Sequence, residues 1–400
     1  MKPAIRGGAF LALCIGCLYP SPLFTQPDTS STSERSTFYQ LGGYVKYLFS
    51  NSGIPSVGRV NDHLLHSRIN GKVFFSEEVR LTAELRNRFF YGGSVEDIPD
   101  FLSTVRADHD LPNADIVWWN TRSSVGYSEL DRLWVDATYG KFQVGLGRQR
   151  IAWGTALVWN PTDLFNPLSV LDFDYEERPG VDAVHLQYYS SAVTKVELAV
   201  KPGKTRARSV VAGKVLLNHW NYDIHVLGGT QGGSPFLGGA WAGDIAGAGF
   251  RGEVISKKIN DATVDLFPFL KNAWSTSLAL SADYTFPSNT YIHTEMLFND
   301  RGASGSSLAS AVLSQSLGML SPARWSLFQE LSFDVHPLVR VSGFVIYDLD
   351  DRSSAIVPSV TWSAVENVDV SFFGLFFSGG TLTQYGNYER SVFLRVKWSY

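Results

Sequence analysis

The sequence contains only two cysteines in 400 residues, and both, Cys14 and Cys17, lie close to the N-terminus. If the chain is cleaved after them, the mature protein has no thiol and forms no disulfide. This excludes a disulfide scaffold, a metal site with cysteine ligands and a cysteine nucleophile. Beyond the N-terminal segment the chain also lacks an apolar run of about 18 residues, so we expect no transmembrane helix in the mature protein.

Charged side chains are scarce as well. They make up 18% of the residues and give a formal net charge of −4, which argues against binding to nucleic acid. The motifs HExxH and GxSxG, the P-loop and the dinucleotide-binding glycine pattern are missing, and the eight histidines are dispersed without metal-ligand spacing. We therefore expect no enzyme, no cofactor and no metal ion.

Aromatic residues and glycine are abundant instead. The chain has 26 Phe, 17 Tyr, 11 Trp and 36 Gly. Transmembrane β-barrels place aromatic side chains in belts at both membrane surfaces and use glycine in tight turns. A large soluble β protein can have a similar composition, so the order of the residues has to distinguish the two.

The N-terminus has the pattern of an export signal. Two basic residues precede an apolar stretch over residues 9–18, and a polar, proline-rich stretch follows. This pattern predicts a secretory signal peptide over residues 1–26, cleaved between residues 17 and 26, and a polar lead over residues 27–37. Lipidation at Cys17 is an alternative, because the residues before it resemble the end of a lipobox.

From residue 38 onward, apolar and polar residues alternate in segments of about ten residues that are separated by turn residues. In Val79–Phe89, for example, the apolar residues fall on one face and the charged residues on the other. In a barrel the apolar face meets lipid and the polar face lines the lumen. We predict an all-β protein, a single transmembrane antiparallel β-barrel over residues 38–400. It has about 18 strands, or 16 if one weak pair is not real, and both termini are periplasmic.

The last ten residues carry the most specific signal. Val392, Leu394, Val396, Trp398 and Tyr400 occupy every second position, and the chain stops on the aromatic residue. This resembles the C-terminal strand that the barrel-insertion machinery reads as an exposed edge. We therefore expect these residues to act as a membrane-insertion signal that directs the chain into the cell outer membrane after Sec-type export. There the protein would contact outer-membrane lipid and lipopolysaccharide.

The segment from Gly147 to Pro167 reads G-R-Q-R-I-A-W-G-T-A-L-V-W-N-P-T-D-L-F-N-P. It resembles large porin families related to the alginate-export channels, in which a strand leads through G-R-Q…W-G into an N-P-T-D-type loop. The residues that carry the likeness are Gly145, Gly147, Arg148, Gln149, Trp153, Gly154, Asn160, Pro161 and Asp163. The resemblance implies a monomeric barrel of about 18 strands with a polar lumen narrowed by infolded loops, and it leaves the solute open.

The same resemblance makes residues 147–167 a candidate constriction loop. Its candidate residues are Arg148, Gln149, Arg150, Trp153, Trp159, Asn160 and Asp163. The alternative is an external loop packed by its own Trp153, Trp159 and Phe165. Simple alternation along the preceding strand also puts Arg148 and Arg150 on the lipid side, unless the strand has ended or a bulge turns them inward.

Alternation along the other strands gives a second set of candidates, on the face that lines the lumen. These candidates for the solute path are Arg68, Lys72, Arg80, Glu84, Arg86, Arg88, Arg132, Asp136, Lys195 and Glu197. Charges on this face either act on passing solutes or pair across strands to hold the barrel. The cluster of Arg80, Arg86, Arg88 and Arg132 is the better functional candidate, because it would favour anions.

These expectations favour an outer-membrane, porin-like channel for the diffusion of small polar or anionic solutes or a polysaccharide, in uptake or export. A non-conducting barrel for envelope or surface-polysaccharide assembly is an alternative. An outer-membrane lipase or deacylase needs His and Ser on the lipid-facing surface. Alternation instead puts His66, His185, His225 and His293 inward. A loop with three aspartates, at positions 348, 350 and 351, either holds Ca²⁺ or lipopolysaccharide or is a solvated loop tip.

Overall fold

The computed structural model describes residues 38–54, 57–106, 114–165, 177, 179–303, 305 and 308–400. The predicted signal peptide and polar lead lie outside these described residues, as does the last part of the predicted constriction loop, at 166–167.

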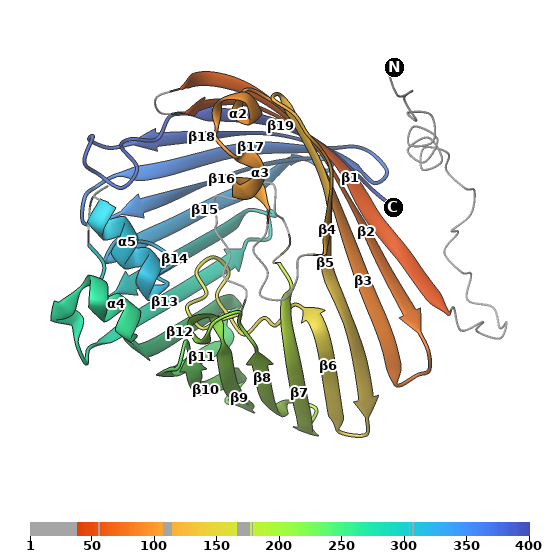
Figure 1. The fold of residues 1–400 in the computed structure, drawn as a ribbon, viewed down its shortest axis with the longest axis vertical. Helices are drawn as coiled ribbons and strands as arrows, with labels where there is room; N and C mark the ends of the chain where they lie inside the picture. The colour runs from red at the N-terminus through yellow and green to blue at the C-terminus, as the bar shows by residue number, and fades with distance from the viewer. Residues whose placement is uncertain are drawn as a thin grey trace, which may run out of the picture. The chain divides into compact units, whose positions relative to one another are not determined.

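The described residues form nineteen strands in one sheet. Their bounds are β1 (Tyr39–Ile54), β2 (Gly58–Phe74), β3 (Val79–Gly92), β4 (Asp115–Asn120), β5 (Ser124–Tyr139), β6 (Phe142–Gln149), β7 (Val181–Ser191), β8 (Thr194–Lys201), β9 (Val210–His219), β10 (Tyr222–Gln231), β11 (Ser234–Ile245), β12 (Ala248–Lys258), β13 (Trp274–Thr285), β14 (Tyr291–Asn299), β15 (Trp325–His336), β16 (Val339–Asp348), β17 (Ser354–Val365), β18 (Val368–Ser378) and β19 (Ser391–Ser399). All except β4 belong to the wall of a closed antiparallel barrel of 18 strands (Figure 1). The predicted fold and the larger strand number are confirmed.

The first and last strands close the wall. β1 pairs with β19 from Tyr44 opposite Ser399 to Ser52 opposite Ser391, and with β2 along its other edge. The N–H groups of Gly43 and Tyr400 each donate to the other residue's carbonyl oxygen at 3.0 Å. No wall strand is therefore left with an unpaired edge, which is the condition for a sheet in contact with lipid.

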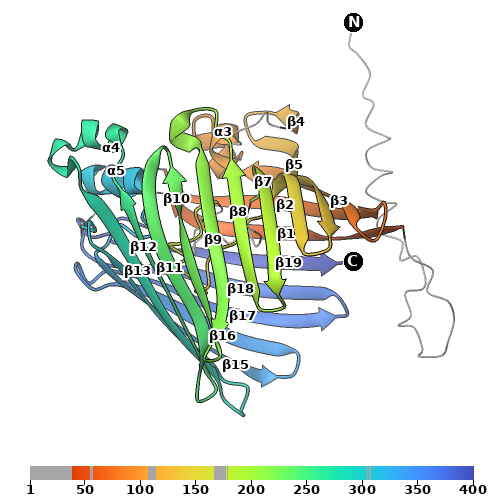
Figure 2. The same cartoon turned by 90° about the horizontal axis from the view of Figure 1, so that it is seen from below.

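The two ends of the barrel differ. The end where β1 begins and β19 finishes has short turns, and we call it the turn end; the opposite end is the loop end. Helices α2 (Gly93–Asp97), α3 (Phe101–Val105), α4 (Asp261–Leu266) and α5 (Leu308–Leu317) and the 3-10 turns η1 (Arg206–Arg208) and η2 (Pro268–Leu270) lie in the loops. Figure 2 shows α4 and α5 beside the ends of β12 and β13. None of the helices in the described part of the chain is long and apolar enough to span a membrane.

Strand β4 was not expected from the sequence. It pairs with β5 over Val125–Glu129, whereas β6 pairs with β5 only from Leu133 onward. β4 therefore extends the sheet at the loop end, where the shorter β6 has already ended.

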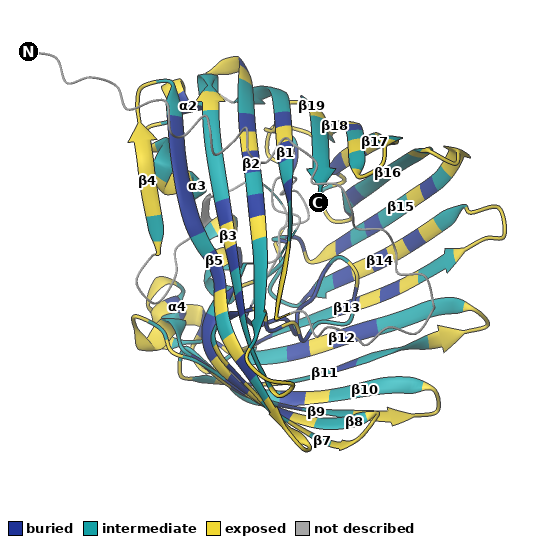
Figure 3. Ribbon diagram, turned by 90° about the vertical axis from the view of Figure 1, so that its right-hand side faces the viewer, coloured by how far each residue is buried: buried dark blue, intermediate teal, exposed yellow. Residues whose placement is uncertain are grey.

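The outer surface of the wall is apolar. Leu198, Val226 and Leu280 in the middle of the strands are exposed, whereas their sequence neighbours Ala199, Leu227 and Ala279 are buried. Figure 3 shows that buried and exposed positions alternate along the strands. Exposed aromatic residues at the turn end include Tyr39, Tyr139, Phe142, Trp220, Phe286, Trp362 and Tyr400, and those toward the loop end include Tyr91, Trp119, Trp274 and Trp325. Two aromatic rims around an apolar band are the pattern of a barrel that lies in a bilayer.

Candidate functional site

The chain turns into the barrel directly after β6. We call residues 150–165 the infolded segment. Trp153 and Phe165 lie in a buried cluster with inward-facing residues of β7 to β12, and their rings meet edge to face at 5.1 Å. Trp159 lies in a second cluster, with inward-facing residues of β13 to β17, and its ring is 6.3 Å from that of Phe328. The three aromatic residues are 1–3% exposed, so the segment is packed against the wall as well as on its own Trp153–Phe165 pair.

Three buried glutamates on the wall hold this segment. Glu197 on β8, Glu253 on β12 and Glu295 on β14 are each at most 3% exposed. The indole N–H of Trp153 donates to Glu197 at 3.2 Å. The other two glutamates accept hydrogen bonds mainly from the main chain.

Glu253 accepts from the N–H groups of Thr155, Ala156 (2.7 Å) and Thr162 (3.0 Å), and from the Thr162 hydroxyl at 2.6 Å. Glu295 accepts from three consecutive N–H groups, those of residues 157, 158 and 159. The segment forms no helix or strand, so its buried N–H groups need other acceptors. Hydrogen bonds to a charged group contribute about 1.5–3 kcal/mol each, which makes these two carboxylates the main polar attachment of the segment.

Two glycines of the family-like motif have a steric role. Gly147 has φ 123°, and a side chain there would collide with the carbonyl oxygen of Leu133 on β5. A side chain at Gly154 would collide with the side chain of Asn160, which folds back onto it. The first glycine permits the departure from β6, and the second permits the tight reversal inside the lumen.

A basic recess of about 320 Å³ lies where the segment leaves the wall, toward β3, β5, β7 and β8. Its charged lining residues are Arg80, Arg132, Arg150, His185, Lys195, Asp136 and Glu197. Arg80 pairs with Asp136 at 2.9 Å, and Lys195 pairs with Glu197 at 3.0 Å. Arg150 is exposed, and no carboxylate of a described residue lies within ion-pair distance of it.

Most of the remaining predicted lumen residues form ion pairs or hydrogen bonds with other residues of the wall and its loops. Arg86 and Glu129 form an ion pair at 2.8 Å in which both side chains are 3% exposed. Arg88 donates to the hydroxyl of Tyr127 and to the carbonyl oxygen of Val105, both at 2.9 Å. The four arginines predicted as one cluster therefore divide, because only Arg80 and Arg132 line the recess.

Arg68 is the centre of a buried charge network. It is fully buried and contacts Glu84 and Asp131 at 2.5 Å each and Glu177 at 3.0 Å. Arg132 also reaches Glu84, at 3.2 Å. Lys72 is half-buried on β2, opposite Gln40 and Thr82, and stays a candidate for the solute path.

The predicted constriction residues have different surroundings. Arg148 makes a two-point ion pair with Asp182 on β7, at 3.0 and 3.2 Å, and donates to the carbonyl oxygen of Leu130. Gln149 is buried and donates to the carbonyl oxygen of Ala183 at 3.1 Å. Asn160 and Asp163 are buried in the segment, where the N–H of Asp163 donates to the Asn160 carbonyl oxygen. β6 ends at Gln149, so the alternation that put Arg150 on the lipid side no longer applies to it.

A serine, a histidine and a glutamate stand in line on the inward face of three neighbouring strands. The Ser281 hydroxyl is 3.0 Å from His293 Nε2, and His293 Nδ1 is 3.7 Å from Glu330. Ser281 and His293 are each 1% exposed, so a substrate has no access to the hydroxyl. The described residues contain no group of three or more His, Cys, Asp or Glu that would hold a metal ion.

The aspartate loop between β16 and β17 ties loops together. Asp351 accepts from the hydroxyl and N–H of Ser353, at 2.6 and 2.9 Å, and from the N–H of Gln384 at 2.6 Å. Burial alone would raise the pKa of Asp351, but these hydrogen bonds hold it below its ordinary value. The next residue, Tyr385, belongs to the buried cluster around Trp159, and burial raises the pKa of its hydroxyl. Asp348 is 1% exposed, so the loop is not simply a solvated tip.

Solved structures share this architecture. Pseudomonas aeruginosa OccK5 (OpdH) has a TM-score of 0.57 at 9% identity, with 90% of this chain and 97% of that chain covered. A BenF-like porin from Pseudomonas fluorescens Pf-5 has a TM-score of 0.55 at 9% identity, with 90% and 98% covered. Pseudomonas aeruginosa OccK2 (OpdF) in complex with glucuronate has a TM-score of 0.53 at 8% identity, with 90% and 97% covered.

At such low identity the likeness establishes the fold alone. No family model matches the sequence, and no curated protein matches it either. The type of barrel is therefore that of these porin structures, and the specific alginate-export relation remains a prediction from the motif around Gly147.

Two of the three attachment points of the segment, Glu253 and Glu295, were not among the candidate residues named from the sequence, whereas Glu197 was. A signal was available for Glu253, because it shares an inward face with Ile255 on a strand whose outward side is apolar. A carboxylate among apolar neighbours needs local donors, and those came from a segment about a hundred residues earlier in the chain.

Proposed function

We propose that this protein is an outer-membrane channel through which small polar solutes, and anions in particular, diffuse past the infolded segment. The observation that carries the proposal is the recess between the segment and β3, β5, β7 and β8. It contains Arg150, which is without a carboxylate partner among the described residues, beside Arg80, Arg132 and Lys195. A constriction lined by an excess of positive charge lowers the energy of a passing anion.

Two further observations support the proposal. The apolar outer band with its two aromatic rims suits contact with lipid. Polar side chains of the strands are then left to line the interior of the barrel, as a water-filled channel requires. The structural neighbour OccK2 was solved with glucuronate, a sugar acid, and the fold is therefore one that accommodates a carboxylate. The infolded segment favours small solutes over a polysaccharide, because it occupies part of the lumen.

The localisation follows the same line. We propose that the termini, both at the turn end, face the periplasm and that β19 carries the insertion signal, with Leu394 and Tyr400 exposed on the outer surface. We further propose a monomer, in keeping with the family that the motif resembles.

A planar-bilayer recording tests the function. The purified protein is expected to insert and conduct, and a KCl gradient is expected to give a reversal potential of the sign for anion preference. Absence of conductance from correctly folded protein would reject the channel and favour a non-conducting barrel that serves envelope assembly. Conductance with a cation-selective reversal potential would reject the anion preference alone.

A further inference from the structure

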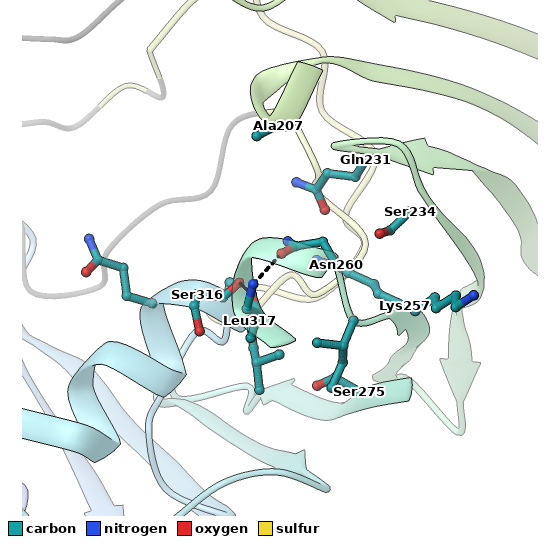
Figure 4. Close-up of a pocket in the computed structure, with 13 residues that line it drawn as sticks. Ala207, Gln231, Ser234, Lys257, Asn260, Ser275, Ser316 and Leu317 are labelled. Atoms are coloured by element: carbon teal, nitrogen blue, oxygen red, sulfur yellow. Dashed lines mark hydrogen bonds between the residues drawn. The ribbon is translucent and has the colours of Figure 1, made fainter. Parts of the chain in front are cut away.

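A second polar recess lies at the loop end, away from the recess beside Arg150. It has a volume of about 190 Å³ and is enclosed by β12, β13, the turn between β10 and β11, and the ends of α4 and α5 (Figure 4). Its polar lining includes Gln231, Ser234, Lys257, Ser275, Gln315 and Ser316. A single buried water needs about 10–15 Å³ measured in this way, so the recess has room for a small molecule.

Lys257 supplies the charge of this recess. It lies on the inward face of β12, because Ile255 and Glu253, two and four residues earlier, are buried while Val254 is exposed outside. Its ammonium nitrogen lies 4.0 Å from the position that a Cβ atom of Gly318 would take, just after α5. Among the described residues, none forms an ion pair or hydrogen bond with it.

The rest of the lining is suited to complement a negative charge. It contains no carboxylate from the described residues, and the two aspartates of the adjacent helix α4, Asp261 and Asp265, are exposed. The α4 cap uses the side chain of Asn260, which accepts from the Thr263 N–H at 2.8 Å. Lys257 is half-buried, which removes part of the solvation of its ammonium group, and an anion in the recess would offset that cost.

We propose that this recess binds a small oxyanion of the phosphate or sulfate class, with Lys257 as its charged ligand. Lysine acts as a point charge toward phosphate, and it presents three donors. Ser275 lines the recess from the wall, and Gln315 and Ser316 line it from the end of α5. Donors from the wall and from the loop thus surround one volume, as a tetrahedral anion requires.

The proposal does not rest on the channel function. No residue of this recess lines the one beside Arg150, and the two lie on different strands, β12 and β13 against β3 to β8. Occupancy of the loop-end recess and ion selectivity of the lumen are therefore independent measurements. Free phosphate and a phosphorylated lipid headgroup offer the same chemistry, so the experiment has one arm for each.

The test is a titration of the full-length protein in detergent with inorganic phosphate, followed by ³¹P NMR, at constant chloride. A parallel arm uses micelles that contain a phosphorylated lipid and no free phosphate. Lys257→Met is expected to weaken phosphate binding about tenfold or more, the effect of losing one charge-assisted hydrogen bond. Lys271→Met, an exposed lysine of the same loop, is expected to bind as the unchanged protein does.

Saturable binding of free phosphate that is lost in Lys257→Met supports a soluble ligand, and binding in the lipid arm alone supports a headgroup. No saturable binding in either arm, or equal binding by Lys257→Met, overturns the proposal. Folding of each variant is checked by heat-modifiable migration in gels. If Lys257→Met does not fold, Gln315→Leu decides in its place, because unchanged affinity in that variant would overturn the proposal as well.

Discussion

Two parts of the barrel wall differ in the kind of side chain that they carry on their inward faces. Along β2, β3 and β5 the inward side chains are long and charged, and they pair across strands, as Arg68 does with Glu84 and Arg86 with Glu129. Along β7 to β14 the inward face carries many small and apolar residues, among them Ala199, Leu227 and Ala279, interrupted by a smaller number of charged side chains. The first wall faces the lumen with its charges neutralised, and the second is covered by the infolded segment.

The difference shows why the segment folds inward on one side only. An apolar inward face in contact with water is unfavourable, and at about 25 cal/mol per Å² its coverage stabilises the segment. A face of paired charges offers no such gain, because the segment would have to desolvate them. The proposed passage for solutes therefore lies beside the charged wall, at the recess that contains Arg80 and Arg150.

The largest expected effect concerns the charged wall. Arg68→Met leaves Glu84 and Asp131 buried without their main partner, and uncompensated buried charge costs about 3–5 kcal/mol. We expect a clearly lower midpoint in urea unfolding followed by tryptophan fluorescence. Arg59→Met, at an exposed position of the same strand, is the control and should leave the midpoint near that of the unchanged protein. Equal midpoints for both variants would show that the charged wall is not held by this network.

The attachment of the infolded segment to the covered wall is expected to weaken in the double variant Glu253→Gln and Glu295→Gln. Each change keeps the shape of the side chain but removes its negative charge. Each hydrogen bond that the side chain accepts from an N–H group of the segment is therefore weakened by about 1 kcal/mol. We expect the infolded segment to detach part of the time, which raises the mean single-channel conductance and its noise. Glu330→Gln, a partly exposed glutamate of the neighbouring β15, serves as the control. A conductance unchanged from that control would argue that packing alone holds the segment.

Ion selectivity is expected to depend on the charged wall rather than on the covered wall. Arg80→Gln with Arg150→Gln removes two positive charges from the recess without breaking a fully buried pair. Partly exposed charges act with up to about 1 kcal/mol, so we expect the anion preference to fall by up to about fivefold. The reversal potential in a KCl gradient measures it. Arg340→Gln removes a charge near the turn end, paired there with Asp334, and is expected to shift it less. Equal shifts would place the selectivity in the overall charge rather than in the recess.

The smallest effect is expected from pH, at the loop that covers Trp159. The pKa of Asp351 is held below its ordinary value, so its contribution to stability is present above the unfolded pKa of about 3.9 and is lost as pH falls through the lower folded value. Limited proteolysis within residues 379–390 should therefore stay constant from neutral pH to about pH 5 and increase only in stronger acid. Asp351→Asn should show the increased cleavage already at neutral pH. Cleavage that rises between pH 7 and 5 would contradict the assignment.

Much of the wall was predictable because successive side chains of a strand in a barrel point alternately outward and inward. Alternation in Val79–Phe89 predicts which side chains face outward, and this rule depends on two sequence neighbours only. The turns between consecutive strands are also local, which is why the larger strand number was predicted. The short strand β4 was missed because its four central residues, 116–119, are apolar without alternation.

The site was harder to predict because it depends on contacts between distant residues. The inward course of the segment after Gln149 came from a resemblance, and no local pattern distinguishes it from an external loop. The division of the arginine cluster was also beyond alternation. Arg86 and Arg80 share a face, and only their partners, Glu129 within the wall and Asp136 beside the recess, separate them.

The attachment of the segment through its main chain has a consequence for how such a pore can change. Glu253 and Glu295 accept from peptide N–H groups at positions 155–159, and every residue type except proline provides one there. Leu157, which is 46% exposed, is consequently open to substitution without loss of the scaffold that carries it. With the proposed channel function, we expect single replacements at that position to alter permeability while the architecture stays intact.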